Sequence, residues 1–346
     1  MNLDDAAAFA TVDRRDALAD VEGTAAQWRN ARALPDVDLS TRGTQLVLVT
    51  GMGGSGVTGD VLAALAAERS GPPVLVSKGY DVPAFVSTRT LLIAISHSGN
   101  TEETLAAVDR GLDRGAQLLA VTSGGALLEH ARQIGAPAIV VPGGGQPRHS
   151  LGWLLVPLLR ALGLDDGLDE AIDLLAELAV RWGRSVPTEE NAAKHLGQRL
   201  ASGGVPVILG GPGIAAVAAY RAKCQLNENA KLPAHTVVLP EADHNEVVGW
   251  QETSALTGSS GMLEVRDGVG NEHPRVATRF RVTREILEPS LAWTEAIHAE
   301  GDSVLARMAS LLLAVDLSSV YAALARDVDP SPIPHIDRLK AALASS

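Results

Sequence analysis

Short apolar runs alternate with longer stretches of helical periodicity along most of the chain. In the first half, the runs rich in valine, isoleucine and leucine lie at residues 45–50, 73–77, 90–96, 117–122 and 137–141. Each run is apolar along its length, as in a parallel strand that is buried on both faces of a sheet. Stretches of helical spacing separate them, at residues 56–69, 101–114, 126–135 and 151–162. This alternation predicts a doubly wound α/β lobe.

The second half of the chain repeats this order. Strand-like runs lie at residues 205–209, 236–239, 261–265 and 279–282, and helical stretches at 214–231 and 302–326. A glycine-rich turn again follows the first of these strands, at residues 210–213. We therefore expect two tandem doubly wound lobes with mostly parallel sheets, plus a short helical N-terminal segment. The expected boundaries are residues 1–43 for that segment, 44–165 for the first lobe, 166–186 for a helical linker and 187–346 for the second lobe.

The composition limits the kinds of partner that the chain can bind. Its 346 residues carry a formal net charge of −12 and no long basic run, which disfavours nucleic acid and anionic membranes. No apolar run approaches the roughly 18–20 residues of a membrane span, and the N-terminus is acidic where a signal peptide would be basic. The single cysteine, Cys224, excludes an internal disulfide and a cysteine-based zinc site. We expect a cytoplasmic protein that binds neither nucleic acid nor membrane.

A glycine-rich turn follows the first predicted strand, at residues 51–56. The sequence Gly-Met-Gly-Gly-Ser-Gly matches the G-x-G-x-x-G pattern of dinucleotide-binding turns. Such a turn needs a carboxylate near the end of the second strand, where this chain has Lys78. A lysine could instead suit a 2′-phosphate, so binding of NADP stays open as an alternative. A second alternative is a turn whose glycines serve close packing of the helix alone.

A second polar turn follows the third predicted strand, at residues 96–101. Ser96, Ser98 and Thr101 supply three hydroxyls, and Gly99 allows close approach of the backbone. The amides of a helix N-terminus and the positive end of its dipole favour an anion there. Ligands of open α/β sheets bind beyond the carboxyl ends of the strands, which is where this turn lies. The turn therefore predicts a phosphate site, and the alternative is an ordinary helix N-cap by Thr101.

The sequence Ser-x-Ser-Gly-Asn-Thr-Glu after a buried strand resembles the signature of sugar isomerase (SIS) domains. In that family the loop binds the phosphate of a sugar phosphate. The resemblance makes both lobes SIS-type and implies phosphate contacts from both turns of the first lobe. The residues implied are Gly54, Ser55, Ser96, Ser98 and Thr101.

Further blocks resemble the bifunctional phosphoglucose/phosphomannose isomerases across residues 45–340. They are Gln-Pro-Arg at 146–148, Asn-Glu-Asn-Ala-Lys-Leu-Pro-Ala at 227–234, His-Asn-Glu-Val-Val-Gly-Trp at 244–250, and two C-terminal segments at 329–332 and 336–340. The chain departs from the family pattern at His97, where an aromatic residue is usual, at Asp243, where asparagine is usual, and at Ser331, where threonine is common. These departures leave the preference between glucose 6-phosphate and mannose 6-phosphate open.

The resemblance implies an aldose–ketose isomerase that forms fructose 6-phosphate through a cis-enediol. Glu228 would act as the base, Arg148 would stabilise the enediolate, and His244 would move the proton that opens the sugar ring. Lys340 matches a family lysine that reaches the active site. The resemblance also implies a homodimer in which His244 enters the neighbouring subunit's site. We expect no cofactor and no metal. The alternatives are an isomerase of another phosphosugar and a non-catalytic sugar-phosphate sensor.

Overall fold

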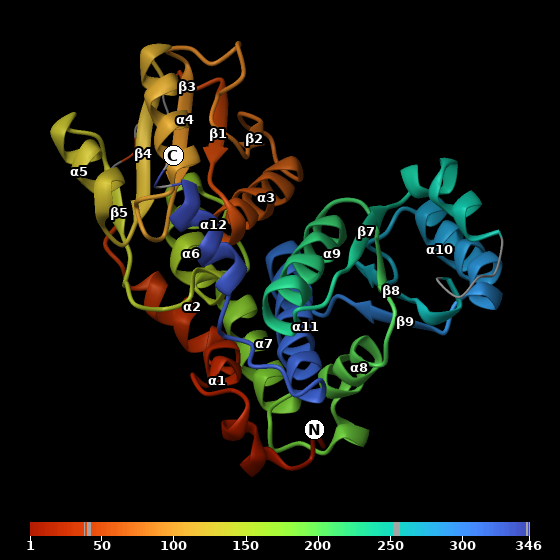
Figure 1. The fold of residues 1–346 in the computed structure, drawn as a ribbon. Coiled ribbons are helices and arrows are strands. Elements are labelled where there is room, and N and C mark those ends of the chain that lie inside the picture. Colours follow the sequence, from red (N-terminus) through yellow and green to blue (C-terminus); the bar gives the residue numbers. More distant parts are fainter. Residues whose placement is uncertain (38, 40–42, 252–256, 344, 346) are drawn as a thin grey trace. The chain divides into compact units, whose positions relative to one another are not determined.

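Two parallel sheets organise the chain in the computed structural model, which describes all residues except 38, 40–42, 252–256, 344 and 346 (Figure 1). Within these residues, the first sheet has the strand order β2-β1-β3-β4-β5 and the second has the order β7-β6-β8-β9. All their pairings are parallel. The strands are β1 (Leu46–Thr50), β2 (Val74–Ser77), β3 (Thr90–Ile95), β4 (Gln117–Thr122), β5 (Ala138–Val140), β6 (Val207–Gly210), β7 (His235–Val238), β8 (Gly261–Arg266) and β9 (Trp293–His298).

Helices connect these strands and also form the N-terminal segment. They are α1 (Ala17–Glu22), α2 (Thr24–Arg32), α3 (Gly53–Ala67), α4 (Glu102–Asp113), α5 (Gly125–Gln133), α6 (Leu151–Leu162), α7 (Leu168–Arg181), α8 (Ala192–Ala201), α9 (Ile214–Gln225), α10 (Pro274–Leu287), α11 (Val304–Ala325) and α12 (Pro334–Leu343). The predicted α/β class with mostly parallel sheets is confirmed.

The chain divides into two compact units. The first-lobe unit contains Gly23–Ala176 and Glu300–Ala309, and holds β1 to β5. The second-lobe unit contains Met1–Glu22, Glu177–Ala299 and Ser310–Ser346, and holds β6 to β9. The first residues of the chain therefore pack with the second lobe. One such contact is made by the N-terminal ammonium, which donates to the carbonyl oxygen of Ala325 at 3.1 Å.

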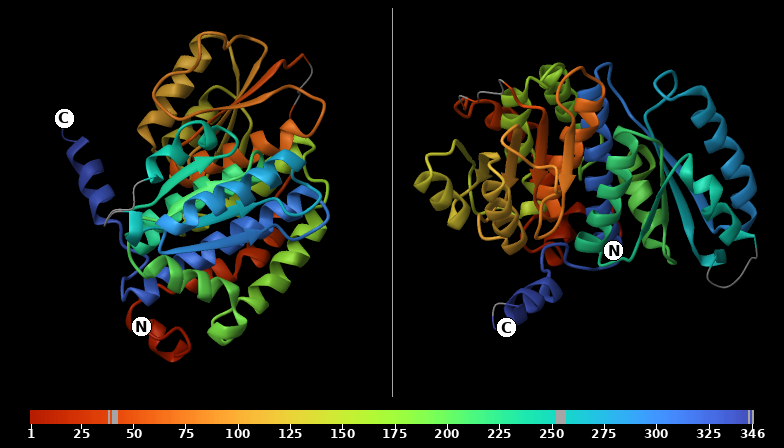
Figure 2. Two further views of the ribbon diagram at one scale, coloured as in Figure 1. Left: turned by 90° about the vertical axis from the view of Figure 1, so that its right-hand side faces the viewer. Right: turned by 90° about the horizontal axis from the view of Figure 1, so that it is seen from above.

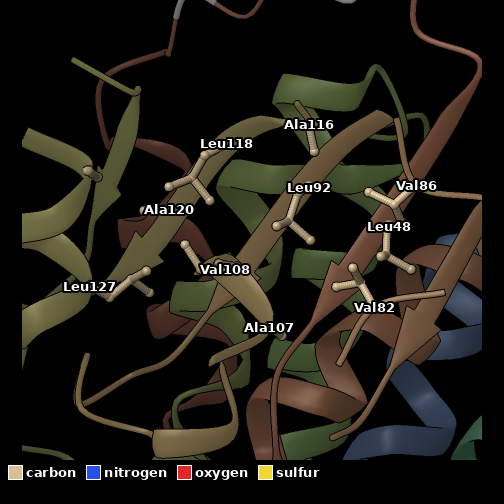
Figure 3. Packing of buried hydrophobic residues seen from close by; sticks show 12 residues of the cluster. Leu48, Val82, Val86, Leu92, Ala107, Val108, Ala116, Leu118, Ala120 and Leu127 are labelled. Atoms are coloured by element: carbon tan, nitrogen blue, oxygen red, sulfur yellow. The ribbon is translucent and has the colours of Figure 1, made fainter. Parts of the chain in front are cut away.

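The central strands of the first sheet, β1, β3 and β4, are buried on both faces because they run between two layers of helices. Register partners such as Leu48, Leu92 and Leu118 share one face, where they pack against Ala107 and Val108 of α4 (Figure 3). The opposite face, at Val49 and Val76, lies against α3, where a Cβ added to Gly59 would approach these valines within 3.1 Å. This burial on both faces explains why these three strands read as continuous apolar runs. The outer strands β2 and β5 each keep an exposed residue, Leu75 and Val140.

The second sheet has α10 on one face, where Phe280 is buried against Leu209 and Met262. Figure 2 shows α10 alongside this sheet in two further views. The prediction of a strand at residues 279–282 is wrong, because these residues lie within α10. The alternation of arginine with apolar residues there has the period of a strand, but Val276, Phe280 and Leu287 lie on one helical face. The fourth strand of this sheet is β9, which we did not predict.

A polar seam joins α9 to α11 inside the second-lobe unit. Arg221 makes two hydrogen bonds to Asp316, at 2.7 and 2.6 Å, and Gln225 donates to the same carboxylate at 2.8 Å. One turn further along the chain, Asn229 donates to Ser319 at 2.9 Å. The Arg221 side chain is 2% exposed, and breaking such a buried pair by removing one partner costs about 3–5 kcal/mol. These hydrogen bonds therefore hold the C-terminal half of α9 and the turn after it against α11.

Among the described residues, α11 is long and apolar enough to cross a membrane, although Arg307 and Asp316 interrupt its apolar residues. In the structure, 94% of its most apolar window is buried, as expected for the core helix of a folded lobe. This burial gives its hydrophobicity a packing explanation.

Candidate functional site

The two polar turns of the first lobe lie side by side at the carboxyl edge of the first sheet. Strands β1 and β3 are neighbours, yet the chain connects β1 to β2 on the other side, so the strand order reverses between them. A Cβ added to Gly51 would lie 2.8 Å from the carbonyl oxygen of Ile95, which shows how closely the two turns approach. Open α/β sheets bind their ligands at such a switch point.

The glycine turn opens directly into α3. This helix begins at Gly53, whose φ of +54° is a backbone conformation that L-residues rarely adopt. Ser55 lies in the first turn of the helix and is 5% exposed. Backbone amides in this turn have no partner within the helix. The turn therefore supplies amide donors and one hydroxyl.

Arg148 lies against this turn. It belongs to a 3₁₀ turn at Pro147–His149, and its side chain is 3% exposed. A Cβ added to Gly54 would approach the carbonyl oxygen of Pro147 to 2.9 Å and the Cα of Arg148 to 3.3 Å. Only a residue without a side chain permits this approach. The structure thus brings Arg148 to the turn of Gly54 and Ser55, which belongs to a different sequence motif.

The hydroxyl loop at residues 96–101 is held by bonds among its own members. The hydroxyls of Ser96 and Thr101 are 2.8 Å apart, and the amide of Gly99 donates to Ser96 Oγ at 3.1 Å. Thr101 occupies the N-cap position of α4, but its side chain makes no capping hydrogen bond. The alternative of an ordinary N-cap by Thr101 is therefore wrong. The exposed Ser98 completes the loop, and its Oγ accepts from the amide of Asn100 at 3.3 Å.

Gly99 and Asn100 join this loop to the loop that follows β4, at residues 123–126. Gly99 has a φ of +71°, and a Cβ added to it would lie 1.7 Å from the carbonyl oxygen of Gly124. The side chain of Asn100 accepts from the amide of Ala126 at 3.0 Å. Glycine is required at position 99 on both grounds, since a side chain would be strained and would also collide.

Lys78 does not offer a free cation for a dinucleotide phosphate. Its Nζ lies 2.6 Å from Asp60 of α3, and both side chains are less than a third exposed. Burial raises the pKa of the Asp60 carboxyl, and the bond to Lys78 opposes that shift. A Cβ added to Gly56 would lie 3.1 Å from Cε of Lys78, so this turn is packed against the lysine stem. The NADP alternative therefore loses the residue on which it depended.

His97 is a further buried residue of the hydroxyl loop, next to the buried Ser96. Its backbone carbonyl accepts from the amide and the hydroxyl of Ser123, at 3.0 and 2.6 Å. The side chain is 6% exposed and is hydrogen-bonded to the backbone of Pro142, which can only accept. Burial lowers the pKa of this imidazole, and the bond to Pro142 opposes that shift. A neutral ring therefore links the hydroxyl loop to the segment that leads to Arg148.

Glu228 lies in a π-helical turn, Leu226–Ala230, at the end of α9. Such turns are rare and are often found at functional sites. The asparagines on either side hold the turn, because Asn227 donates to the carbonyl oxygen of Leu232 at 3.2 Å and Asn229 donates to Ser319. Glu228 itself is half-buried. The two asparagines of the sequence motif thus have a structural role that spacing alone did not reveal.

Lys231 ends this turn, and its role was not predicted from the sequence. Its φ of +52° is unusual for a residue with a side chain. Its Nζ donates to the carbonyl oxygen of Glu228 at 2.6 Å and to that of Pro330 at 2.9 Å. The C-terminal segment around the buried Ser331 is thereby joined to the catalytic candidate. The position of this lysine in the Asn-Glu-Asn-Ala-Lys block was the signal that could have identified it.

His244 and Lys340 differ from Glu228 in being exposed. Among the described residues, the His244 side chain has neither a hydrogen-bond partner nor an ion-pair partner. It follows β7, whereas Glu228 precedes that strand. Lys340 lies on α12, which buries none of its side chains and stands apart from the rest of its unit in both views of Figure 2. The structure brings neither residue into a described contact with Glu228.

Known families match both lobes. The SIS domain family matches residues 44–133, and the bacterial phospho-glucose isomerase C-terminal SIS domain matches residues 189–343. The first match contains both polar turns of the first sheet. The second contains Glu228, His244 and Lys340.

Whole-chain relatives agree with these families. A bifunctional phosphoglucose/phosphomannose isomerase from Caldicellulosiruptor bescii is 38% identical, with 89% of this chain and 92% of that protein covered. One from Aquifex aeolicus is 36% identical, with 85% and 89% covered. The solved structure of a glucose-6-phosphate isomerase like protein from Thermus thermophilus covers 98% of both chains with a TM-score of 0.65. At 20% identity, that structure supports the fold.

The close approach at Gly54 can be tested with Gly54→Ala. The added methyl must displace the 3₁₀ turn of Arg148, so we expect a loss of about 1–3 kcal/mol of unfolding free energy and weaker binding of inorganic phosphate. Urea denaturation and titration calorimetry measure the two effects. Gly71→Ala is the matched control, since its Cβ meets open space. Unchanged stability and phosphate affinity in Gly54→Ala would contradict the contact.

The neutral state of His97 predicts a pH dependence of stability. Because burial lowers its pKa in the folded chain, the unfolded chain takes up a proton at this residue before the folded chain does. This contribution to stability is present above the unfolded pKa of about 6.5 and is lost as the pH falls below it. In urea denaturation from pH 8 to pH 5, we expect the wild type to lose more unfolding free energy than His97→Phe. Parallel curves for the two proteins would show that the imidazole is not kept neutral.

Proposed function

Since the chain belongs to the bifunctional phosphoglucose/phosphomannose isomerase family, we propose that it interconverts glucose 6-phosphate and mannose 6-phosphate with fructose 6-phosphate through Glu228, Arg148 and His244. The observation that supports Arg148 and the phosphate residues is the approach of Arg148 to the Gly54–Ser55 turn, beside the hydroxyl loop. Glu228 and His244 are assigned from the motifs that the family shares. Sugar phosphates are substrates of the cytoplasm, and we propose that location for the enzyme.

The phosphate group of the substrate is bound by the two turns at the switch point of the first lobe. Ser55, Ser96, Ser98 and Thr101 supply hydroxyl donors, and Gly54 supplies a backbone amide. Two observations support this role. The side chain of Thr101 is not engaged in capping α4, and amides at the start of a helix favour an anion. Neutral donors suit a chain whose net charge is −12, because they bind phosphate without a cluster of cations.

Proton transfer between C2 and C1 of the open-chain sugar is assigned to Glu228. The carboxylate removes the C2 proton of the aldose, and the carbonyl oxygen at C1 takes the negative charge. A proton then passes from the C2 hydroxyl to the C1 oxygen, and the carboxyl group returns the first proton to C1, which gives the ketose. Arg148 stabilises the enediolate, since its guanidinium is always charged and presents fixed donors. No net redox change occurs, so the step needs no co-reactant. Lys340 is assigned to the same site as an additional cation.

His244 is assigned to ring opening, and the neighbouring copy of the chain is proposed to supply it. An imidazole can both give and take a proton near neutral pH, as ring opening requires. Its exposure supports an action outside its own subunit, and so does its position beyond the opposite end of β7 from Glu228. We therefore propose a homodimer with active sites shared between subunits.

The two alternatives are not favoured. A sugar-phosphate sensor would need the phosphate turns alone, whereas the whole-chain relatives are named as isomerases. An isomerase of another phosphosugar would have to depart from those relatives in substrate while matching them over most of the chain. Separate assays with glucose 6-phosphate and mannose 6-phosphate decide between these functions.

Replacement of the proposed base gives the direct test. We expect Glu228→Gln to lower kcat by about 10²–10⁴-fold on both aldoses, measured as formation of fructose 6-phosphate. Affinity for inorganic phosphate should stay near that of the wild type, because the phosphate turns are intact. Glu190→Gln is the control, since Glu190 is exposed, and it should retain full turnover. Full turnover in Glu228→Gln would overturn the assignment of the base.

Shared active sites predict that two inactive variants restore each other. Glu228→Gln and His244→Gln, co-expressed with different tags and purified through both, form heterodimers with one intact site of two. We expect about half of the wild-type kcat per dimer in these heterodimers, and almost none in either homodimer. Inactive heterodimers would mean that Glu228 and His244 act from one subunit. Elution as a monomer in size-exclusion chromatography would contradict the dimer itself.

A further inference from the structure

The turn that carries His244 is joined to α10 through the preceding residue. The Asp243 carboxylate accepts a hydrogen bond from Arg279 Nη1 at 2.6 Å and another from Thr283 Oγ1 at 2.8 Å. Its side chain is 15% exposed, so water screens this ion pair only in part. Arg279 and Thr283 are four residues apart and face the same side of the helix. One carboxylate thus spans two consecutive turns of α10.

Helix α10 is a firm support for this contact. Val276, Phe280 and Leu287 are buried in the core of the second lobe, together with Leu209 and Met262 of the sheet. The position of the sheet therefore determines the position of α10. Through Asp243, α10 in turn determines the position of the turn at Glu241–His244.

Other residues fix the backbone on either side of His244. Ala242 is buried in the same core. Asn245 donates to the carboxylate of Glu241 at 3.1 Å, and its own Oδ1 accepts from the amide of Glu246 at 2.6 Å. The imidazole of His244 is exposed, in contrast to this fixed backbone. The arrangement presents a side chain that is open to a ligand on a turn that is held in place.

We infer that Asp243 is a positioning residue for His244, acting through Arg279 and Thr283. The inference rests on the proposed role of His244 in ring opening. Proton transfer requires donor and acceptor within about 2.6–3.2 Å, and a misplacement of about 1 Å can cost about 100-fold in rate. A loss of the Asp243 contacts releases the turn from α10 while the phosphate turns, which lie in the other unit, stay intact. The contacts therefore act on kcat rather than on substrate binding.

Steady-state kinetics of Asp243 variants test this role. We expect Asp243→Ala to lower kcat by about 10–100-fold, with KM for fructose 6-phosphate changed by less than about threefold. Asp243→Asn should fall between the wild type and Asp243→Ala, because its amide oxygen can still accept from Thr283. Arg279→Ala should resemble Asp243→Ala, and the double variant should lose little more than either single one. Wild-type kcat in Asp243→Ala and Arg279→Ala would overturn the inference.

Two controls separate positioning from general stability. Arg281→Ala removes another ion pair of α10, with Glu285 at 2.7 Å, but both partners are exposed and lie away from the turn. It should keep wild-type kcat. Val276→Ala weakens the packing of α10, and its loss of stability is measured by urea denaturation. If Val276→Ala lowers kcat as much as Asp243→Ala does at equal loss of stability, Asp243 is structural and the inference is wrong.

Tagged heterodimers give a second readout, which a structural role would not produce. Asp243→Ala paired with Glu228→Gln should regain about half of the wild-type kcat per dimer, because one site then combines an intact Glu228 with an intact His244. Asp243→Ala paired with His244→Gln should stay low. The opposite pattern would overturn the inference, because Asp243 would then act on its own subunit's Glu228. If the reference pair of Glu228→Gln with His244→Gln stays inactive, the shared site is wrong, and the kinetics of the Asp243 and Arg279 variants still decide the role of Asp243.

Discussion

The contact between Gly54 and Pro147 is the constraint on which the first-lobe site depends. It lets a 3₁₀ turn from the far end of the lobe lie against the first turn of α3, with 2.9 Å between a would-be Cβ and a carbonyl oxygen. Without this approach, Arg148 would not lie beside the glycine turn. With it, a permanent cation, a buried serine and a row of helix amides share one edge of a parallel sheet. The absence of a side chain at one position thus assembles groups from separate parts of the sequence.

In the second lobe, a different kind of contact holds the site residues in position. Its support comes from charge pairs between helices and turns, such as the Arg221–Asp316 pair behind α9 and the Asp243–Arg279 pair on α10. Hydrogen bonds to charged groups are directional and stronger than neutral ones. Glu228 and the turn of His244 are therefore held by polar contacts, whereas Arg148 in the first lobe is placed by close backbone packing.

The fold of the first lobe was predictable from sequence because its strands read as unbroken apolar runs, and the central strands β1, β3 and β4 are buried on both faces. The second lobe was harder. Residues 279–282 alternate in polarity, yet they belong to a helix whose apolar face became visible only with Phe280 packed on Leu209. The residue types of the site were predictable from motifs. Their supports were not, because Arg279 lies 36 positions from Asp243 and Pro330 lies 99 from Lys231, and such pairings depend on packing rather than on local pattern.

The π-helical turn at Leu226–Ala230 has a consequence for how this segment can change in evolution. Its hydrogen bonds close over one more residue than those of an α-helix, so it stores a single extra residue within the helix end. Loss of one residue there would restore the regular helix and rotate the segment after it by about 100°. Exposed chain segments usually tolerate insertions and deletions. Here Lys231 and Asn229 are each bonded to other segments. We therefore expect homologous proteins to keep the length of this segment as strictly as they keep Glu228.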